Sequence, residues 1–238
     1  PLRIVAVSAT LPNIVDIASF VEAPEPFSFD GSYRPVPLTT HVLSFGWIGK
    51  NQYMFDKSLN KHLPEIVAMY SNNRPTIIFC HTKKEVMKSV NLFNLRLSLL
   101  TIAYIHHVFI LLLFQTEEIA SQLQAFDIQH DRQKILSTAA SQVSVPALGN
   151  CLRHGSAYHH AGLEAEDRQI IEHAFSAGAI RCLCATSTLA MGVNLPAHLV
   201  IIKGTSAWRG AGVGHEEIDK GTLLQMMGRA GRPGFDTN

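Results

Sequence analysis

Two arginines near the end of the chain have the chemistry and spacing expected of a phosphate-binding site. Arg229 and Arg232 are three residues apart within the run QMMGRAGRP, residues 225–233. The apolar residues before them predict a helix that ends at Pro233, and residues three apart lie on one helix face. Two planar, permanently charged guanidinium groups on one face suit a phosphate group, and the glycines beside them allow a neighbouring backbone to approach closely. A solvated basic helix face is the alternative interpretation.

Further segments upstream resemble, in order, the motifs of one enzyme family. SAT (8–10), TIIFC (76–80) and ATSTLAMGVNLPA (185–197) resemble motifs III, IV and V of the superfamily 2 helicases, and residues 225–232 resemble motif VI. Two other runs, SYRPVPL (32–38) and YHHAGL (158–163) followed by Asp167-Arg168, match the DExH subgroup of Ski-type, Brr-type and meiotic crossover helicases. The chain is identified as a member of this subgroup, and motif V and the closing GRAGRPGFDT are most similar to the meiotic crossover (Mer- or HFM-type) DNA helicases.

The pattern of strands and helices predicts an α/β fold. Short apolar runs that alternate with helical segments imply a parallel sheet with helices on both faces. The expected strands are Leu2–Val7, Thr76–Cys80, Ala157–His160, Ile180–Ala185 and Leu199–Ile202. The expected helices are Asn13–Phe20, Leu59–Tyr70, Lys83 to about Leu95, Ala120–Leu136, one after Leu163 that buries Ile170, Ile171, Ala174 and Phe175, and one before Pro233. The resemblance implies that residues 1–34 end a first RecA-like domain and that residues 35–238 form a second one.

The resemblance also implies roles for individual residues around ATP. Arg229 and Arg232 would act as arginine fingers on the γ-phosphate, and Gln225 would couple the nucleotide to Ser8 and Thr10 of motif III. Gly192 and Asn194 would approach the nucleotide, which is expected to be ATP with Mg²⁺.

A second group of residues is expected to contact nucleic acid. Thr82, Thr186 and Gly204-Thr205 follow predicted strands, and hydroxyl and backbone donors at those ends can bind phosphates without reading bases. The hydroxyls could instead cap the following helices. Of the pair His159-His160, one is expected to be buried and the other, His160, to lie near the nucleic-acid channel. Because adjacent strand residues point to opposite faces, joint metal binding by the pair is not expected.

Some helicase motifs do not occur in the sequence. It contains no G-x-x-x-x-G-K-[ST] phosphate loop and no D-E-x-H box before Ser8, and Gly49-Lys50 has the wrong spacing and is expected in a surface loop. The main ligands of ATP and Mg²⁺ are therefore expected outside this chain, which alone would be inactive. The expected partners are a first RecA-like domain and single-stranded or branched DNA, or RNA, in the nucleus. A nonenzymatic nucleic-acid-binding or regulatory module is the alternative.

Composition sets only broad limits. The chain has 238 residues, 47% of them hydrophobic, which is enough for one or two cores, and its net charge of +1 does not by itself indicate nucleic-acid binding. The four cysteines form no C-x-x-C pair, so structural zinc is not expected. We expect the protein to reside in a reducing compartment. The N-terminus does not have the pattern of a secretory signal.

One apolar run does not fit the helicase pattern. Residues 97–114 read LSLLTIAYIHHVFILLLF, long enough to raise the question of a membrane span, but with two central histidines. We interpret this atypical insertion as a translated intron or a faulty gene model rather than a buried helix, and a membrane helix is the least favoured explanation.

Overall fold

The computed structural model describes residues 3–8, 13–23, 25–47, 51–81, 86, 89–90, 117–208 and 214–236. Within these ranges the side chains of residues 53, 57, 117–129 and 207–208 are not described. Residues 97–114 therefore lie outside the described part of the chain. Within that part, no helix is both long and apolar enough to cross a membrane.

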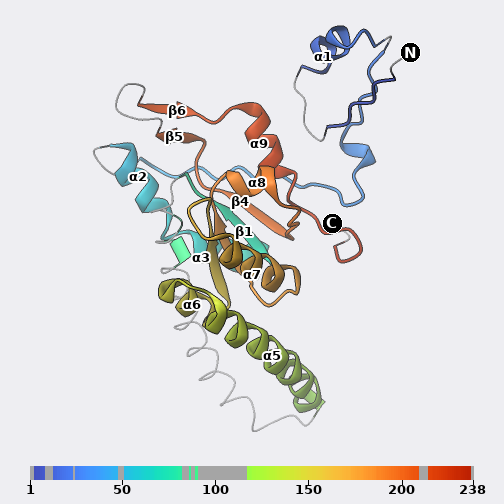
Figure 1. Ribbon diagram of the computed structural model, residues 1–238. Coiled ribbons are helices and arrows are strands. Elements are labelled where there is room, and N and C mark those ends of the chain that lie inside the picture. Colours follow the sequence, from blue (N-terminus) through green and yellow to red (C-terminus); the bar gives the residue numbers. More distant parts are fainter. Residues whose placement is uncertain are drawn as a thin grey trace.

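A four-stranded parallel sheet forms the centre of the molecule (Figure 1). Its strands are β1 (Thr76–Phe79), β2 (Ser156–His159), β3 (Cys182–Ala185) and β4 (Leu199–Ile202), in the spatial order β2-β3-β1-β4. The last residues of the strands are level, because Phe79 is paired with both Ala185 and Ile202, and Ala185 with His159. Every residue of β1, β2 and β3 is buried, and β1 and β3 accordingly read as short apolar runs rather than alternating ones. The predicted α/β RecA-like fold is confirmed.

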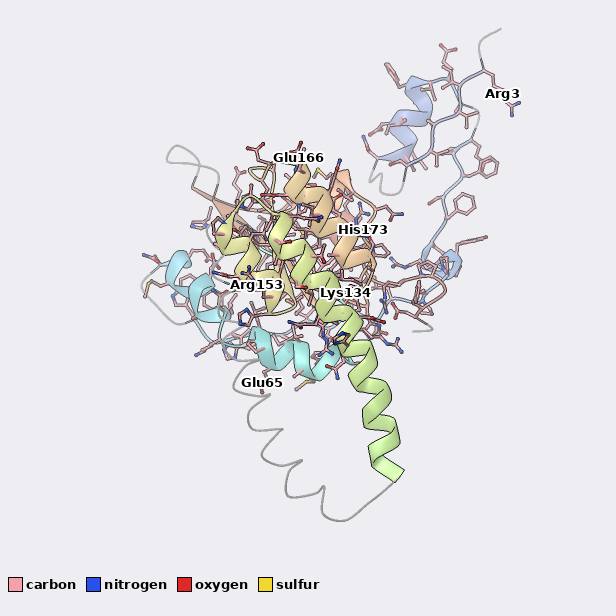
Figure 2. All side chains as sticks on the ribbon, turned by 60° about the horizontal axis from the view of Figure 1, so that its bottom comes forward. Arg3, Glu65, Lys134, Arg153, Glu166 and His173 are labelled. Carbon is pink, nitrogen blue, oxygen red and sulfur yellow. The ribbon has the colours of Figure 1, made fainter. Side chains whose placement is uncertain are left out.

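Helices pack on both edges of this sheet. The long helix α5 (Glu117–Gln142) contacts α6 (Pro146–Arg153) and α7 (Ala165–Ser176), and the last two also contact β2. At the other edge, α9 (Lys220–Met227) contacts β4 and the short helix α8 (Thr188–Gly192). Figure 2 shows the outward surface of the first group, with Lys134 on α5, Arg153 on α6, and Glu166 and His173 on α7, all exposed.

The four cysteines lie in the buried core. Cys80, Cys151, Cys182 and Cys184 are all buried and free. Burial raises the pKa of the Cys151 thiol to about 11, so it remains protonated and behaves as a small apolar side chain.

An extended segment is fastened along helices α2 (Gln52–Leu59) and α3 (Leu63–Tyr70) by three aromatic pairs. The ring centroids are 4.9 Å apart for His41 and Tyr70, 4.3 Å for Phe45 and His62, and 4.9 Å for Trp47 and Phe55. Because residues 41, 45 and 47 are spaced by even numbers, an extended chain presents all three rings to the same side. These pairs hold the connection that leads into the sheet domain.

The N-terminal segment differs from the prediction. Residues 3–8 form no strand and are exposed, with Val7 93% accessible, so the expected strand Leu2–Val7 is wrong for the residues described. A strand needs a neighbouring strand for its backbone, and none of the described strands pairs with this segment. The helix α1 (Ile14–Phe20) and the 3₁₀ turn η1 (Gly31–Tyr33) follow, and α1 lies apart from the sheet in Figure 1.

Several helix predictions also needed correction. The expected helix Leu59–Tyr70 begins only at Leu63, because Pro64 suits the first turn of a helix but not its interior, and Leu59 is instead the last residue of α2. Helix α5 extends beyond the predicted Ala120–Leu136 at both ends. Of the expected Lys83–Leu95 helix only residues 86, 89 and 90 are described, and they are helical. Helix α6 and the antiparallel pair β5 (Ser206–Trp208) and β6 (His215–Glu217) were not predicted.

Candidate functional site

Helix α9 positions the two arginines, but they lie beyond its end. Asp219 caps the start of the helix by accepting hydrogen bonds from the Thr222 backbone N–H at 2.8 Å and hydroxyl at 2.6 Å. The helix ends at Met227, with Gly228 as its C-cap. The expectation that it runs to Pro233 and carries both arginines on one face is therefore wrong. We call residues 228–236 the arginine loop.

A glycine allows the chain to turn within the arginine loop. Gly231 has φ +89°, a left-handed conformation that other residues rarely adopt. A Cβ atom at this position would lie 3.0 Å from the Cβ of Val36, so the segment that enters the domain packs directly on the loop. Arg34 strengthens this contact by donating from Nη2 to the Ala230 carbonyl at 2.7 Å.

The arginine loop is joined to motif V through backbone hydrogen bonds. Ala197 donates its N–H to the Arg229 carbonyl at 2.8 Å, and its own carbonyl accepts from the Gly231 N–H at 2.8 Å. These bonds form a parallel bridge between Ala197 and Ala230. The predicted interdomain segment, motif V and motif VI thus meet at one place.

Each arginine has its own partner. Arg229 donates from Nη2 to the Ala190 carbonyl in α8, and partial burial lowers its pKa. Arg232 donates from Nε and Nη2 to the two carboxylate oxygens of Asp236, at 3.1 and 3.2 Å. The two guanidinium groups are therefore fixed by different elements rather than by a shared helix face.

The other residues predicted near ATP are only partly brought together. Gly192 and Asn194 are exposed at the end of α8, the helix that Arg229 contacts, and the space beside Gly192 is open. The side-chain oxygen of Gln225 is buried and has no hydrogen-bond partner among the residues described. Ser8 is exposed, and its coupling to Gln225 stays a prediction. Thr10 lies outside the described residues.

The predicted nucleic-acid contacts lie at the carboxyl edge of the sheet. Thr186 follows β3, and its N–H donates to the His159 carbonyl at 3.2 Å. Gly204 and Thr205 follow β4, where Thr205 is exposed. The Thr186 hydroxyl is 2.8 Å from that of Thr188, in the first turn of α8, so it also belongs to the start of that helix. Thr82 lies outside the described residues.

The two histidines differ in environment, and neither is open to solvent. His159 is bonded through Nε2 to Glu172 of α7 at 2.9 Å, and burial lowers its pKa more than Glu172 raises it. His160 accepts the Gly162 N–H on Nδ1 at 3.1 Å and stacks on Tyr158. The sequence predicted that His160 lies near the nucleic-acid channel, and both histidines are at most 8% exposed. The rings point to opposite sides, and among the described residues no cluster could hold a metal ion.

Comparison with known proteins agrees with this geometry. Residues 118–234 match the helicase conserved C-terminal domain. Over its whole length the chain is 39% identical to the human "Probable ATP-dependent DNA helicase HFM1", of which it covers 15%. It is 37% identical to the "ATP-dependent DNA helicase MER3" of Saccharomyces cerevisiae, of which it covers 17%. Over 99% of its length it is also 37% identical to the "Pre-mRNA-splicing factor brr2" of Schizosaccharomyces pombe, of which it covers 10%. Residues 118–234 are therefore a helicase C-terminal domain. The chain spans about a sixth or less of the length of these relatives.

Two contacts of this helicase domain escaped sequence reasoning. The Ala190 carbonyl that holds Arg229 is a backbone group, which no residue pattern reveals. Asp236, which holds Arg232, did leave a signal, because an acid four residues from an arginine is within reach in a turn or helix. The helical interpretation, which ended at Pro233, left Asp236 outside the site.

Proposed function

We propose that residues 35–238 form the second RecA-like domain of an ATP-dependent DNA helicase, that residues 1–34 end the first, and that Arg229 and Arg232 are the arginine fingers of the second. The observation that carries the proposal is the joining of the arginine loop to motif V, by two backbone bonds at Ala197 and by Arg229 on α8. Preorganised positive groups stabilise the charge that develops on a phosphoryl group far better than mobile ones.

The residues present suit a triphosphate bound with Mg²⁺. Arg229 and Arg232 would hold its terminal phosphate, and Gly192 and Asn194 are exposed at the end of the helix that Arg229 contacts. The Gln225 side-chain oxygen is a buried acceptor that has no donor among the described residues. ATP, when bound, supplies the phosphoanhydride whose hydrolysis drives the motor. We propose that a first RecA-like domain contributes the phosphate loop and the Mg²⁺ ligands, and that Gln225 couples to Ser8 and Thr10 when the domains close.

The carboxyl edge of the sheet is proposed to hold the nucleic-acid strand. Thr186, Gly204 and Thr205 offer hydroxyl and backbone groups there, and we include Thr82 and His160 as further contacts. Such groups bind the phosphate backbone regardless of sequence, as a translocating motor requires. The names of the two DNA-helicase relatives support DNA as the substrate, and the splicing relative keeps RNA as the second substrate class. We propose that the strand is single-stranded or branched DNA and that the protein acts in meiotic recombination in the nucleus.

Conservative arginine variants of the full-length protein test the finger assignment. Arg229→Lys and Arg232→Lys keep the charge but lose the planar fork, so each should lower kcat for DNA-stimulated ATP hydrolysis by about 10²–10³-fold while strand binding changes little. Arg153→Lys, at an exposed position on α6, is the matched control and should leave kcat unchanged. Near-normal turnover in both loop variants would contradict the assignment.

A further inference from the structure

Asp236 is a buried carboxylate on which three separate segments converge. Its side chain is 1% exposed, and it accepts hydrogen bonds from Arg74 Nη1 at 2.9 Å, from His198 Nδ1 at 3.1 Å and from Arg232. Arg74 precedes β1, His198 directly precedes β4, and Arg232 belongs to the arginine loop. One carboxylate therefore joins the starts of the central strand β1 and the edge strand β4 to the loop.

Arg232 donates most of the hydrogen bonds that Asp236 accepts. Besides the two bonds from Nε and Nη2, its backbone N–H donates to Oδ2 of Asp236 at 2.9 Å. The ring of Phe235 lies 5.4 Å from the guanidinium carbon and supports the group from one face. The orientation of the guanidinium plane is thus set by Asp236 and its neighbour.

The bonding pattern leaves part of the guanidinium available. Nε and Nη2 form the side that faces the carboxylate, whereas Nη1 makes no hydrogen bond to any residue the structure describes. Arg229, by contrast, contacts a carbonyl rather than an acid. The two arginines therefore differ in that only Arg232 is held by a counter-charge.

The charges around Asp236 do not cancel. Two guanidinium groups and an imidazole share a single negative charge, so the cluster keeps an excess of positive charge even with Arg232 fixed. Burial by itself raises the pKa of the Asp236 carboxyl, but Arg232 and His198 lower it to about 2, and it is ionised at neutral pH.

We propose that Asp236 is a positioning residue for Arg232, which fixes the guanidinium plane and leaves Nη1 for a phosphate oxygen. The inference rests on the proposed function of Arg232 and adds a residue to it. A group held in place before the nucleotide binds loses less entropy when the charge develops, and a displacement of about 1 Å can cost about 100-fold in rate.

The test compares variants of the full-length protein in DNA-stimulated ATP hydrolysis. Asp236→Asn keeps the shape but removes the charge, and it should lower kcat about 10- to 100-fold with the KM for ATP changed less than about threefold. Arg74→Gln is the matched control, because it removes a different partner of the same carboxylate. It should lower the melting temperature and leave kcat within about twofold of the parent protein.

A double variant separates positioning from stability. If Asp236 acts through Arg232, Asp236→Asn should add little to the defect of Arg232→Lys. Unchanged kcat in Asp236→Asn, an equal loss in Arg74→Gln, or additive losses in the double variant would each overturn the inference. If Asp236→Asn does not fold, Asp236→Glu, which keeps the charge but shifts it by one methylene, is tested in its place, and normal kcat again overturns the inference.

The two proposals fail in different ways. Normal turnover of Arg232→Lys would refute the finger assignment itself. A defective Arg232→Lys together with an active Asp236→Asn would refute only the role given to Asp236.

Discussion

Gly231 is the position in the arginine loop where an added side chain should do most harm. Its φ of +89° already disfavours any other residue, and a Cβ would lie 3.0 Å from the Cβ of Val36. A left-handed conformation costs a non-glycine residue about 1–2 kcal/mol, and overpacking costs about 1–3 kcal/mol more. We expect Gly231→Ala to lower the free energy of unfolding by both amounts, as measured by denaturant titration.

A second glycine of the same loop provides the control. Gly234 has a similar φ of +84°, but nothing lies within 4 Å of the Cβ it would carry. Gly234→Ala should therefore show the backbone cost alone. Equal destabilisation by the two variants would mean that the contact with Val36 does not matter to stability.

At the scale of helices, Asp167 joins α7 to the turn before α6. Its buried carboxylate accepts hydrogen bonds from the Ser144 N–H at 2.8 Å and the Ser144 hydroxyl at 2.7 Å. Asp167→Asn retains the shape but loses an acceptor, so we expect a loss of about 1–3 kcal/mol in the free energy of unfolding. The neighbouring exposed Glu166→Gln makes the same chemical change and should stay within about 0.5 kcal/mol. Matching effects of the two variants in thermal or denaturant unfolding would show that the Ser144 bonds contribute nothing.

Sequence reasoning succeeded for elements whose burial is complete. Strands such as Cys182–Ala185 are buried along their whole length, and a short apolar run records that directly. It also placed Thr186 and Gly204 at the carboxyl edge of the sheet, since parallel strands end together. The family resemblance, rather than periodicity, supplied the roles of those residues.

The errors have physical causes. The apolar residues before Gly228 predicted a helix that continues to Pro233, but the left-handed Gly231 and the bonds to Ala197 give the loop a different course. The buried contact between Asp167, in the first turn of α7, and Ser144 was likewise not predicted. Tertiary hydrogen bonds of this kind leave no local pattern in the sequence.

At the scale of the whole molecule, Asp236 links stability to pH. Its pKa is lowered to about 2 in the folded protein, from an ordinary value of 3.8. A lowered carboxyl pKa contributes stability that is present above pH 4 and is lost as the pH falls toward 2. We therefore expect the melting temperature to fall across that interval, and to fall less steeply in Asp236→Asn. Parallel curves for the two proteins would show that other carboxylates govern acid unfolding.

The bridge between Ala197 and Ala230 joins the two ends of the chain segment that contains β4, β5, β6 and α9. Since the bridge uses backbone atoms only, it does not depend on which small side chains stand at its ends. Evolution can therefore lengthen or shorten the connection between β5 and β6 without displacing the arginines. Homologues should accordingly vary in length there, and should keep a constant number of residues from α9 to Asp236.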